Sequence, residues 1–413
     1  MYQEKVKTVL EKEHKNRPTL IQTATYDAIK NGASLVALAK TGTGKTLAYA
    51  LPSLERLEPG QANSLVIFAP TTELAVQIRR AINPYIHALG LRGVSLVGAG
   101  NRKRQEDNLK KKHPEVVIAT PGRFFDFFSS GRIKLNQIKT LIIDEADDIL
   151  EFTKMNLLSS LGQNLGSDSQ ILLFGATDSE ITREAEELFE RNFLLIDVRK
   201  EQETENKNYF LQVDNAHKIE FLQRLTRLEN FKGILFFDSN QTMLKFAGIF
   251  SHTKTKFDLL ATDFGKERRQ KALHNLASGK TKLLLATDLA ARGLDIPGLT
   301  YVINFDIPRD VNTYLHRAGR TGRMNAVGYV VSLGNDHDFR DLRKLLEDHV
   351  ELTRVYFSGN KLTTKLPKKK KKVEKITKEE QSENKVVKAN KKKRKKRNNK
   401  NKGYHPHYLK VKK

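Results

Sequence analysis

Short apolar runs alternate along the chain with longer segments that mix polar and apolar residues. The runs are rich in Val, Ile and Leu, and most of them end in a polar turn. Strands of this kind, separated by segments of helical length, are typical of parallel sheets covered by helices on both faces. The runs that predict strands of a first α/β domain are Ser34–Ala39, Ser64–Ala69, Gly93–Val97, Glu115–Ala119, Thr140–Ile143, Gln170–Phe174 and Phe193–Val198.

A second series of apolar runs follows the charged segment 199–208, which lacks apolar periodicity and is interpreted as a linker. The pattern therefore predicts two doubly wound α/β domains, at residues 1–198 and 209–358. The runs that predict strands of the second domain are Tyr209–Val213, Gly233–Phe237, Asp258–Ala261, Lys282–Ala286, Tyr301–Phe305 and Tyr329–Leu333.

The apolar pattern stops near Gly359, and residues 359–413 are predicted to be a lysine-rich disordered tail. Residues 361–413 hold 23 Lys and Arg against 4 Glu, a net charge of +19 out of +25 for the chain. The rest of the chain is nearly balanced at +6. An acidic polymer is the expected partner, nucleic acid rather than membrane, because the tail has no amphipathic apolar face.

The composition excludes several classes of protein. There are no cysteines, so disulfides, thiol catalysis and cysteine-ligated metal sites are excluded. No apolar run approaches the ~18 residues that a membrane span needs. Residues 1–17 are charged and lack the apolar core of a signal peptide. We therefore expect a cytoplasmic protein with no membrane partner.

A glycine-rich loop, Lys40–Thr46, directly follows the first predicted strand and precedes a helical pattern. Glycines let backbone N–H groups turn onto a phosphate, and the helix N-terminus adds positive potential. Lys45 and Thr46 can then reach phosphate and Mg²⁺. The sequence predicts a phosphate-binding loop here. Upstream, residues 1–33 are predicted to be helical, with one helix beginning near Pro18.

Three acidic residues, Asp144, Glu145 and Asp147, follow the strand at residues 140–143. Ligands bind beyond the carboxyl ends of strands in open α/β sheets, and carboxylates there suit metal and water handling. A solvated acidic turn is the alternative, and taken alone it is as good an explanation. Together with the phosphate loop, the acidic strand end predicts a nucleotide-hydrolysing site.

The second domain has no phosphate loop, but it has the arginine-rich segment His316–Arg323. A charged surface helix is one explanation of three arginines at a spacing of three. The other is that Arg320 and Arg323 meet a phosphate bound on the first domain, as arginine fingers do. The segment Ala286–Pro297 likewise places polar residues just after a strand.

These motifs, in this order and spacing, resemble those of DEAD-box ATP-dependent RNA helicases of superfamily 2, over about residues 15–335. The resemblance implies two RecA-like domains facing a cleft, ATP and Mg²⁺ as cofactors, and RNA as partner. The segments that carry it are Pro18–Gln22 (Q motif), Ala39–Thr46 (motif I), Thr120–Arg123 (Ib), Asp144–Asp147 (II), Ala286–Pro297 (V) and His316–Arg323 (VI).

The resemblance also implies roles for single residues. At the nucleotide, Gln22 would read the adenine edge and Asp295 would touch the ribose, while Lys45 would contact the β/γ oxygens. Thr46 and Asp144 would hold Mg²⁺, partly through water, and Glu145 would orient and deprotonate the attacking water. The implied phosphate cradle is Thr41, Gly42, Thr43, Gly44, Lys45 and Thr46, with Arg320 and Arg323 as fingers.

RNA contacts are implied mainly to the backbone, so sequence preference should be slight. The implied contacts are Pro70, Thr71, Gly98, Gly100, Thr120, Pro121, Gly122 and Arg123 in the first domain, and residues near Asp238–Asn240, Arg268 and Thr287 in the second. The residues implied to couple the domains are Asp147, Gly175, Thr177 and His316.

This chain departs from the family at several positions. Thr72 and Gly265 replace a usual arginine and glutamine, and Gly98–Gly100 interrupts a paired glycine. The aromatic residue that the family has before Gln22 is not in register, and Tyr2 is the candidate for its role. The largest departure is Gly175, where the family has a serine that would hydrogen-bond toward Asp147 and His316. We expect ATP turnover to survive this change and its coupling to strand separation to be affected.

The predicted function is ATP-dependent local unwinding or remodelling of short RNA duplexes and RNA–protein complexes by a monomer. A basic tail on a compact core resembles bacterial members that act in ribosome assembly, RNA decay or cold adaptation. The alternative is an ATP-gated RNA clamp or annealing protein that acts through its tail, and a DNA helicase of the same superfamily is a third. Pro367–Val373 also resembles a nuclear localisation signal, although an RNA-binding tail explains it equally well.

Overall fold

The computed structural model describes residues 1–152, 155–176, 181–201, 206–261, 263–291, 296, 298–322, 326–347, 349–359 and 361–365. Most of the predicted tail lies outside these residues. Among the helices that are described, none is both long enough and apolar enough to cross a membrane.

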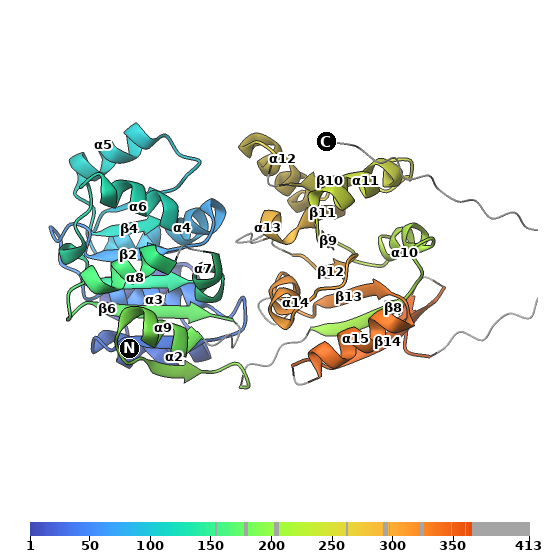
Figure 1. Ribbon diagram of the computed structural model, residues 1–413, viewed down its shortest axis with the longest axis horizontal. Helices are drawn as coiled ribbons and strands as arrows, with labels where there is room; N and C mark the ends of the chain where they lie inside the picture. Colours follow the sequence, from blue (N-terminus) through green and yellow to red (C-terminus); the bar gives the residue numbers. More distant parts are fainter. Residues whose placement is uncertain are drawn as a thin grey trace, which may run out of the picture. The chain divides into compact units, whose positions relative to one another are not determined.

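The first sheet has seven strands in the order β3-β4-β2-β5-β6-β1-β7, and all their pairings are parallel (Figure 1). Every strand predicted from an apolar run is present, with ends within about two residues. The strands are β1 (Leu35–Leu38), β2 (Leu65–Phe68), β3 (Gly93–Leu96), β4 (Val116–Ala119), β5 (Thr140–Asp144), β6 (Gln170–Gly175) and β7 (Leu194–Asp197).

The second sheet has the order β10-β11-β9-β12-β13-β8-β14-β15 and is parallel except for the final hairpin pair, β14 with β15. The six predicted strands are confirmed, and two were missed. The strands are β8 (Lys207–Gln212), β9 (Gly233–Phe237), β10 (Phe257–Leu260), β11 (Leu283–Thr287), β12 (Tyr301–Asn304), β13 (Tyr329–Gly334), β14 (Leu352–Ser358) and β15 (Lys361–Thr363).

Two of these strands correct the predicted boundaries. β8 begins at Lys207, inside the predicted linker, because its first residues pair through their backbones with β13. β15 lies inside the predicted tail, because it pairs through its backbone with β14 in a hairpin. Backbone pairing needs no apolar side chain, so neither extension is visible in an apolar pattern. The other boundaries remain predictions.

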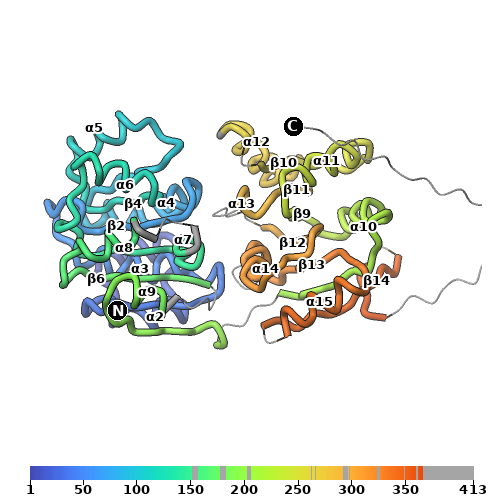
Figure 2. Tube along the Cα trace, in the orientation of Figure 1, coloured from blue at the N-terminus to red at the C-terminus, as the bar shows by residue number. Residues whose placement is uncertain are grey.

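Helices cover both faces of each sheet, as Figure 2 also shows, and each sheet has an apolar cluster on either side. Residues 1–33, predicted to be helical, hold two helices, Glu4–Lys12 and Leu20–Lys30, and residues 13–19 between them are not helical. The second helix has Thr19 as its N-cap, next to the predicted start near Pro18. The helices on the first sheet are α1 (Glu4–Lys12), α2 (Leu20–Lys30), α3 (Lys45–Leu54), α4 (Thr72–Ala88), α5 (Arg102–Lys112), α6 (Pro121–Ser129), α7 (Ala146–Phe152), α8 (Met155–Asn164) and α9 (Ile181–Phe189), with a 3-10 turn at Leu135–Gln137. Those on the second are α10 (Lys218–Leu225), α11 (Asn240–Phe250), α12 (Lys266–Ala277), α13 (Asp288–Ala291), α14 (Val311–Ala318) and α15 (Asp336–Leu346).

The strand order brings the two predicted motifs of the first sheet near each other. β6 lies between β1, which precedes the phosphate loop, and β5, which precedes the acidic residues. The three strands are parallel, so their carboxyl ends meet at one edge of the sheet. Gly175 ends β6 at this edge.

Candidate active site

The loop between β1 and α3 has the backbone of a phosphate-binding loop. Gly42 and Gly44 have φ of +79° and +93°, a region that L side chains rarely adopt. A Cβ on Gly44 would also lie 2.7 Å from Gln22 Nε2. Gly44 is the N-cap of α3, so the loop leads directly into the positive end of that helix.

Lys45 extends its side chain from α3 to the ends of β1 and β6. Its Nζ donates to the backbone oxygens of Ala39 (2.8 Å) and Gly175 (3.3 Å). Burial lowers the pKa of Lys45, and the nearby Asp144 carboxylate opposes that shift. Among its described neighbours, the ammonium is held by neutral carbonyls, a position that suits an incoming phosphate.

Gln22 is buried and joins α2 to the phosphate loop. Its Nε2 donates to the Gly44 oxygen (3.2 Å), and its Oε1 accepts from the Thr19 backbone N–H (3.1 Å). Tyr2, the candidate for the upstream aromatic residue, packs edge-on against Tyr26 at 5.2 Å. Tyr26 donates to Glu55, at the opposite end of α3 from the loop, so Tyr2 lies away from the phosphate site.

Asp144 is a buried carboxylate with two hydrogen bonds. It accepts from the Tyr49 hydroxyl (2.9 Å) and from the Glu145 backbone N–H (3.1 Å). Burial, followed by the charge of Glu145, raises the pKa of Asp144 to about 6. Tyr49 was missed in the sequence, where a tyrosine inside an apolar helix is explained equally well by core packing.

Glu145 lies at a sharp turn between β5 and α7. Its φ is +49°, a conformation uncommon for a residue with a side chain. Its Oε2 atom is buried and has no hydrogen-bond partner among the described residues. Within the described part of the chain, Glu145 Oε2 is thus an unpaired carboxylate oxygen next to Asp144, a carboxyl whose pKa is raised. A divalent cation with its water ligands would bind such oxygens and stabilise their negative charge. The residues present therefore fit Mg²⁺.

His316 on α14 contacts the acidic residues of α7. Its Nε2 and Asp147 Oδ2 are 3.0 Å apart, and its Nδ1 lies 3.8 Å from Asp148 Oδ1. Burial alone would lower the pKa of His316, but the hydrogen bond and charge of Asp147 raise it overall. Two residues that are far apart in the sequence, and that were predicted to couple the domains, are thus brought together.

Arg317, the first of the three spaced arginines, is a structural residue. Its guanidinium is 1% exposed and pairs with Asp288 at 2.6 Å through both Nε and Nη2. It also donates to Asn304 Oδ1 (3.2 Å) and to the Asp306 carbonyl (2.9 Å). One of the three positive charges of the arginine-rich segment is therefore neutralised by an aspartate within the second domain.

Arg320 is buried and close enough to Lys45 for its charge to lower the pKa of that ammonium. A Cβ on neighbouring Gly319 would overlap the Thr41 side chain, so glycine permits this close approach. Thr41 and Lys45 both belong to the phosphate loop, as the finger hypothesis requires. Thr177, Asp295 and Arg323 lie outside the described residues.

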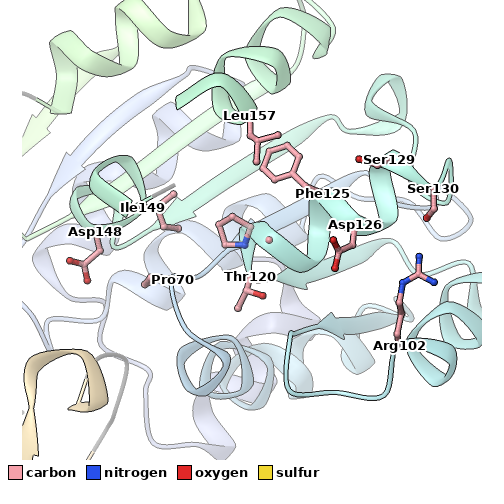
Figure 3. A pocket seen from close by; sticks show the side chains of 12 residues that line it. Pro70, Arg102, Thr120, Phe125, Asp126, Ser129, Ser130, Asp148, Ile149 and Leu157 are labelled. Carbon is pink, nitrogen blue, oxygen red and sulfur yellow. The ribbon is translucent and has the colours of Figure 1, made fainter. Parts of the chain in front are cut away.

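Four of the eight predicted RNA contacts of the first domain line a cavity of about 910 Å³, which we call the α6–α7 groove (Figure 3). These four are Pro70, Thr120, Pro121 and Gly122, whereas Thr71, Gly98, Gly100 and Arg123 are not among its lining residues. Thr71, next to this set, caps α4 by accepting from the Leu74 N–H at 3.2 Å. The groove is lined by Pro70, Arg102, Thr120, Pro121, Gly122, Phe125, Asp126, Ser129, Ser130, Asp148, Ile149 and Leu157.

Arg123 holds the loop that contains Gly98 and Gly100. Its Nη2 donates to the Gly98 oxygen (2.8 Å) and its Nη1 to the Gly100 oxygen (3.2 Å). A Cβ on Gly100 would overlap Gln105 Nε2, while Gly98 has open space around it. Arg123 thus shapes this loop, and Gly98 leaves its backbone accessible.

In the second sheet, Arg268 stacks over the Phe264 ring at 3.7 Å, and Thr287 donates to Asn240 Oδ1 at 3.4 Å. The next residue, Arg269, forms an ion pair with Glu73 of the first sheet at 3.0 Å. This pair was not predicted from the sequence. The signal was present in the adjacent arginines, but their spacing alone does not say which one faces inward.

These features are those of a P-loop protein of two RecA-like domains, with a candidate nucleotide site on the first domain that residues of the second domain approach. A family model described as DEAD/DEAH box helicase matches residues 19–185, and one described as Helicase conserved C-terminal domain matches residues 217–325.

The chain is 36% identical to the probable ATP-dependent RNA helicase YfmL of Bacillus subtilis, over 84% of this chain and 93% of that protein. It is 32% identical to the DEAD-box ATP-dependent RNA helicase CshC of Bacillus cereus, over 85% of this chain and 92% of that protein. A structure of S. cerevisiae Dbp5 bound to RNA and ADP BeF3 superposes with a TM-score of 0.77 at 25% identity, covering 86% of this chain and 94% of that one.

The chain therefore belongs to the DEAD-box ATP-dependent RNA helicases. It is an RNA helicase and ATPase that binds nucleotide and RNA. The predicted family and fold class are confirmed.

Proposed function

We propose that this helicase locally unwinds or remodels short RNA duplexes and RNA–protein complexes while it hydrolyses ATP. The observation that carries the proposal is the 3.0 Å contact between His316 and Asp147. It links the acidic strand end of the first sheet to the arginine-rich segment of the second. Binding of ATP and RNA closes the two domains, and hydrolysis reopens them.

Nucleotide recognition uses α2 and the phosphate loop. Gln22 reads the adenine edge, since it already lies against Gly44 of the loop. Residues 41–46 cradle the phosphates, with the Lys45 ammonium on the β/γ oxygens in place of its present carbonyl partners. Asp295 contacts the ribose.

Hydrolysis uses the acidic strand end. The Thr46 hydroxyl and, partly through water, Asp144 would hold Mg²⁺, which would supply neutralisation of phosphate charge. Glu145 orients the attacking water and accepts its proton, for which it has a free buried oxygen, Oε2. Arg320 and Arg323 stabilise the charge that develops on the transferred phosphoryl group.

RNA binds through its backbone in the α6–α7 groove. Pro70, Thr71, Gly98, Gly100 and residues 120–123 would contact one strand from the first sheet. Arg268 and Thr287 would contact it from the second. Backbone amides and small side chains grip phosphates without reading bases, so sequence preference is slight.

In the cell, we propose a cytoplasmic monomer that acts on structured RNA in ribosome assembly, RNA decay or cold adaptation. What supports a comparison with bacterial RNA helicases is that YfmL and CshC are bacterial and are matched over 93% and 92% of their own length. The tail supports a second candidate, a clamp or annealing protein, because its charge of +19 alone can bring RNA strands together.

ATP dependence separates the two candidates. We expect RNA to stimulate ATP hydrolysis, and ATP to be required for release of a strand from a short RNA duplex. Annealing through a polycationic tail needs no ATP. Duplex release that is equal with and without ATP, or a net gain of duplex in both cases, would favour the clamp and reject the unwinding proposal.

A further inference from the structure

Helix α5 carries most of the excess positive charge of the chain outside the tail. Its residues, Arg102–Lys112, hold six Lys and Arg against Glu106 and Asp107, a net charge of +4. Residues 1–360 together have a net charge of only +6. Within this fully described helix only Gln105 and Leu109 are buried, and every Lys and Arg is exposed. α5 is therefore a basic surface on a body that is otherwise nearly balanced.

This helix is attached to the loop that holds the predicted RNA contacts Gly98 and Gly100. The Gln105 side chain accepts from the Val97 backbone N–H (3.2 Å) and donates to the Val97 carbonyl (3.0 Å). Arg102, the first residue of α5, lines the α6–α7 groove and lies at one end of the side chains labelled in Figure 3. The basic surface thus begins at the edge of the groove.

Three cations gather around Glu106 on this surface, and we call the four residues the Glu106 cluster. Arg102 and Lys110 lie one turn before and one turn after Glu106, with ion pairs of 3.9 and 2.9 Å. Arg132, from the segment after α6, adds a third ion pair at 2.9 Å. The cation side chains are 51%, 53% and 43% exposed, whereas that of Glu106 is 18% exposed. The carboxylate therefore holds the cluster together, while a net charge of +2 stays accessible to solvent.

An RNA strand that leaves the groove past Arg102 would meet this cluster next. Arg102 and Lys110 are eight residues apart, about 12 Å along the helix axis, so the cluster extends the positive surface beyond the groove. Lys and Arg attract phosphates whatever the base, through release of condensed counterions. A protein partner fits less well, because the single apolar residue of α5, Leu109, is buried and provides no anchor for an interface.

We propose that the Glu106 cluster is a second RNA-binding surface, which binds the phosphates of the strand where it leaves the α6–α7 groove. The inference rests on the proposed function, because it takes the groove to be the RNA path. It adds contacts that only an RNA longer than the groove can make. The contribution of the cluster to affinity should therefore depend on RNA length.

The test measures binding of fluorescent oligouridylates of about 6 and about 14 nucleotides to the full chain with AMP-PNP and Mg²⁺, against salt concentration. The cluster variant is Lys110→Gln with Arg132→Gln, two residues that do not line the groove. We expect it to bind the longer RNA about three- to tenfold more weakly at low salt, the size of charge interactions near a protein surface. The slope of log K against log salt should fall by roughly 1.4, since each of two phosphates contributes roughly 0.7. Binding of the shorter RNA should hardly change.

Two controls match the cluster variant. Lys7→Gln with Lys15→Gln removes two positive charges whose side chains are 49% and 45% exposed and which also pair with glutamates. This variant should bind both RNAs like the unsubstituted chain. Lys110→Arg with Arg132→Lys keeps both charges of the cluster and should also bind normally. A loss in this charge-retaining variant equal to that of the cluster variant overturns a contact based on charge.

Gly122→Asp separates this inference from the proposed function. Gly122 lines the groove, and a Cβ there would have open space, so the variant adds a negative charge to the groove. If it weakens both RNAs and the cluster variant weakens neither, the inference is overturned while the groove remains the RNA path. That result would favour an acidic protein segment as the partner of α5. An equal loss for both RNA lengths in the cluster variant also overturns the inference. If Gly122→Asp changes neither affinity, the groove is not the RNA path, and that part of the proposed function fails together with the inference.

Discussion

At the scale of single residues, Glu145 has properties suited to handling water. It holds a positive φ of +49° between β5 and α7, and its buried Oε2 has no hydrogen-bond partner among the described residues. Glu145→Gln should keep nucleotide binding and lower turnover by roughly 10²–10⁴-fold, because the amide cannot accept the proton. Steady-state ATP hydrolysis at saturating RNA measures this effect.

A matched control for Glu145 is Glu187→Gln on α9, whose side chain is 70% exposed. It should hydrolyse ATP at the rate of the unsubstituted chain. A normal rate in Glu145→Gln would remove that residue from the hydrolytic step. If Glu145→Gln instead lost nucleotide binding, the charge of Glu145 would be needed to bind the nucleotide rather than to hydrolyse it.

Asp144 gives a prediction for stability against pH. Its pKa is raised to about 6 by burial and by Glu145, whereas an unfolded aspartate titrates near 4. The folded state therefore holds a proton that the unfolded state loses, so this group's contribution to stability falls between about pH 4 and 6. Asp144→Asn should stabilise the nucleotide-free chain at pH 7 by on the order of 2–3 kcal/mol.

Denaturant unfolding of the two chains across this pH range tests the sign. The advantage of Asp144→Asn should grow from about pH 4 to 6 and then stay level. An advantage that is independent of pH would show that the pKa of Asp144 is not raised in the folded chain. In that case the hydrogen bond from Tyr49, which lowers this pKa, would offset the effect of burial. Tyr49→Phe isolates that hydrogen bond, because it removes only the hydroxyl.

Residue types in motifs were predictable from the sequence, but their partners were not. Lys45, Asp144, Asp147 and His316 all lie at one site, as the motif order predicted. The roles of Tyr49 and Arg317 were missed, because a buried hydroxyl or guanidinium is recognised by its tertiary hydrogen bonds rather than by its neighbours in sequence.

At the scale of elements, continuous apolar runs predicted the central strands well, because a strand buried on both faces needs apolar residues at every position. β14 was missed for the same physical reason. It alternates half-exposed and buried residues and lies near the edge of the sheet, so its signal is weaker. Its hairpin partner β15 has three residues, too few for any pattern.

The end of β6 carries the largest departure from the family. Gly175 contributes its carbonyl to Lys45, while His316 and Asp147 already make a direct contact. Gly175→Ser should leave ATP hydrolysis nearly unchanged and raise the amount of duplex unwound per ATP, because a hydroxyl adds a second link at this contact. Parallel unwinding and phosphate-release assays on both chains provide the measurement.

Gly175→Ala is the control for Gly175→Ser, since it adds a Cβ without a hydroxyl. A gain in the serine variant alone assigns the effect to hydrogen bonding. Equal unwinding per ATP in all three chains would show that the direct contact between His316 and Asp147 is sufficient for coupling.

At the scale of the whole molecule, ion pairs between described residues join the two domains at two places, and both places lie beside functional segments. His316 contacts Asp147 after β5, and Arg269 contacts Glu73 near the predicted RNA contacts Pro70 and Thr71. One link is therefore next to the nucleotide site and the other next to the RNA contacts. This placement is suited to an enzyme in which nucleotide and RNA favour the same arrangement of the two domains.

The basic tail gives the last prediction. The hairpin of β14 and β15 shows that a clean truncation must follow residue 365, not 360. Deleting residues 366–413 removes 21 Lys and Arg and 4 Glu. Binding to single-stranded RNA should weaken strongly at low salt and little at high salt, because each neutralised phosphate contributes roughly −0.7 to the slope of log K against log salt. ATP hydrolysis at saturating RNA should survive.

Truncation after Lys402 is the matched control, since it removes Tyr404 and Tyr408 but few charges. Stacking of these rings on bases would be worth ~1–3 kcal/mol each and would be nearly independent of salt. RNA binding against salt for the full chain, 1–402 and 1–365 separates the two effects. Only some of the 21 basic residues engage at once, so the slope should fall by several units rather than the full number. A slope for 1–365 equal to that of the full chain would exclude the tail from RNA binding and would leave the two sheets as the whole of the RNA site.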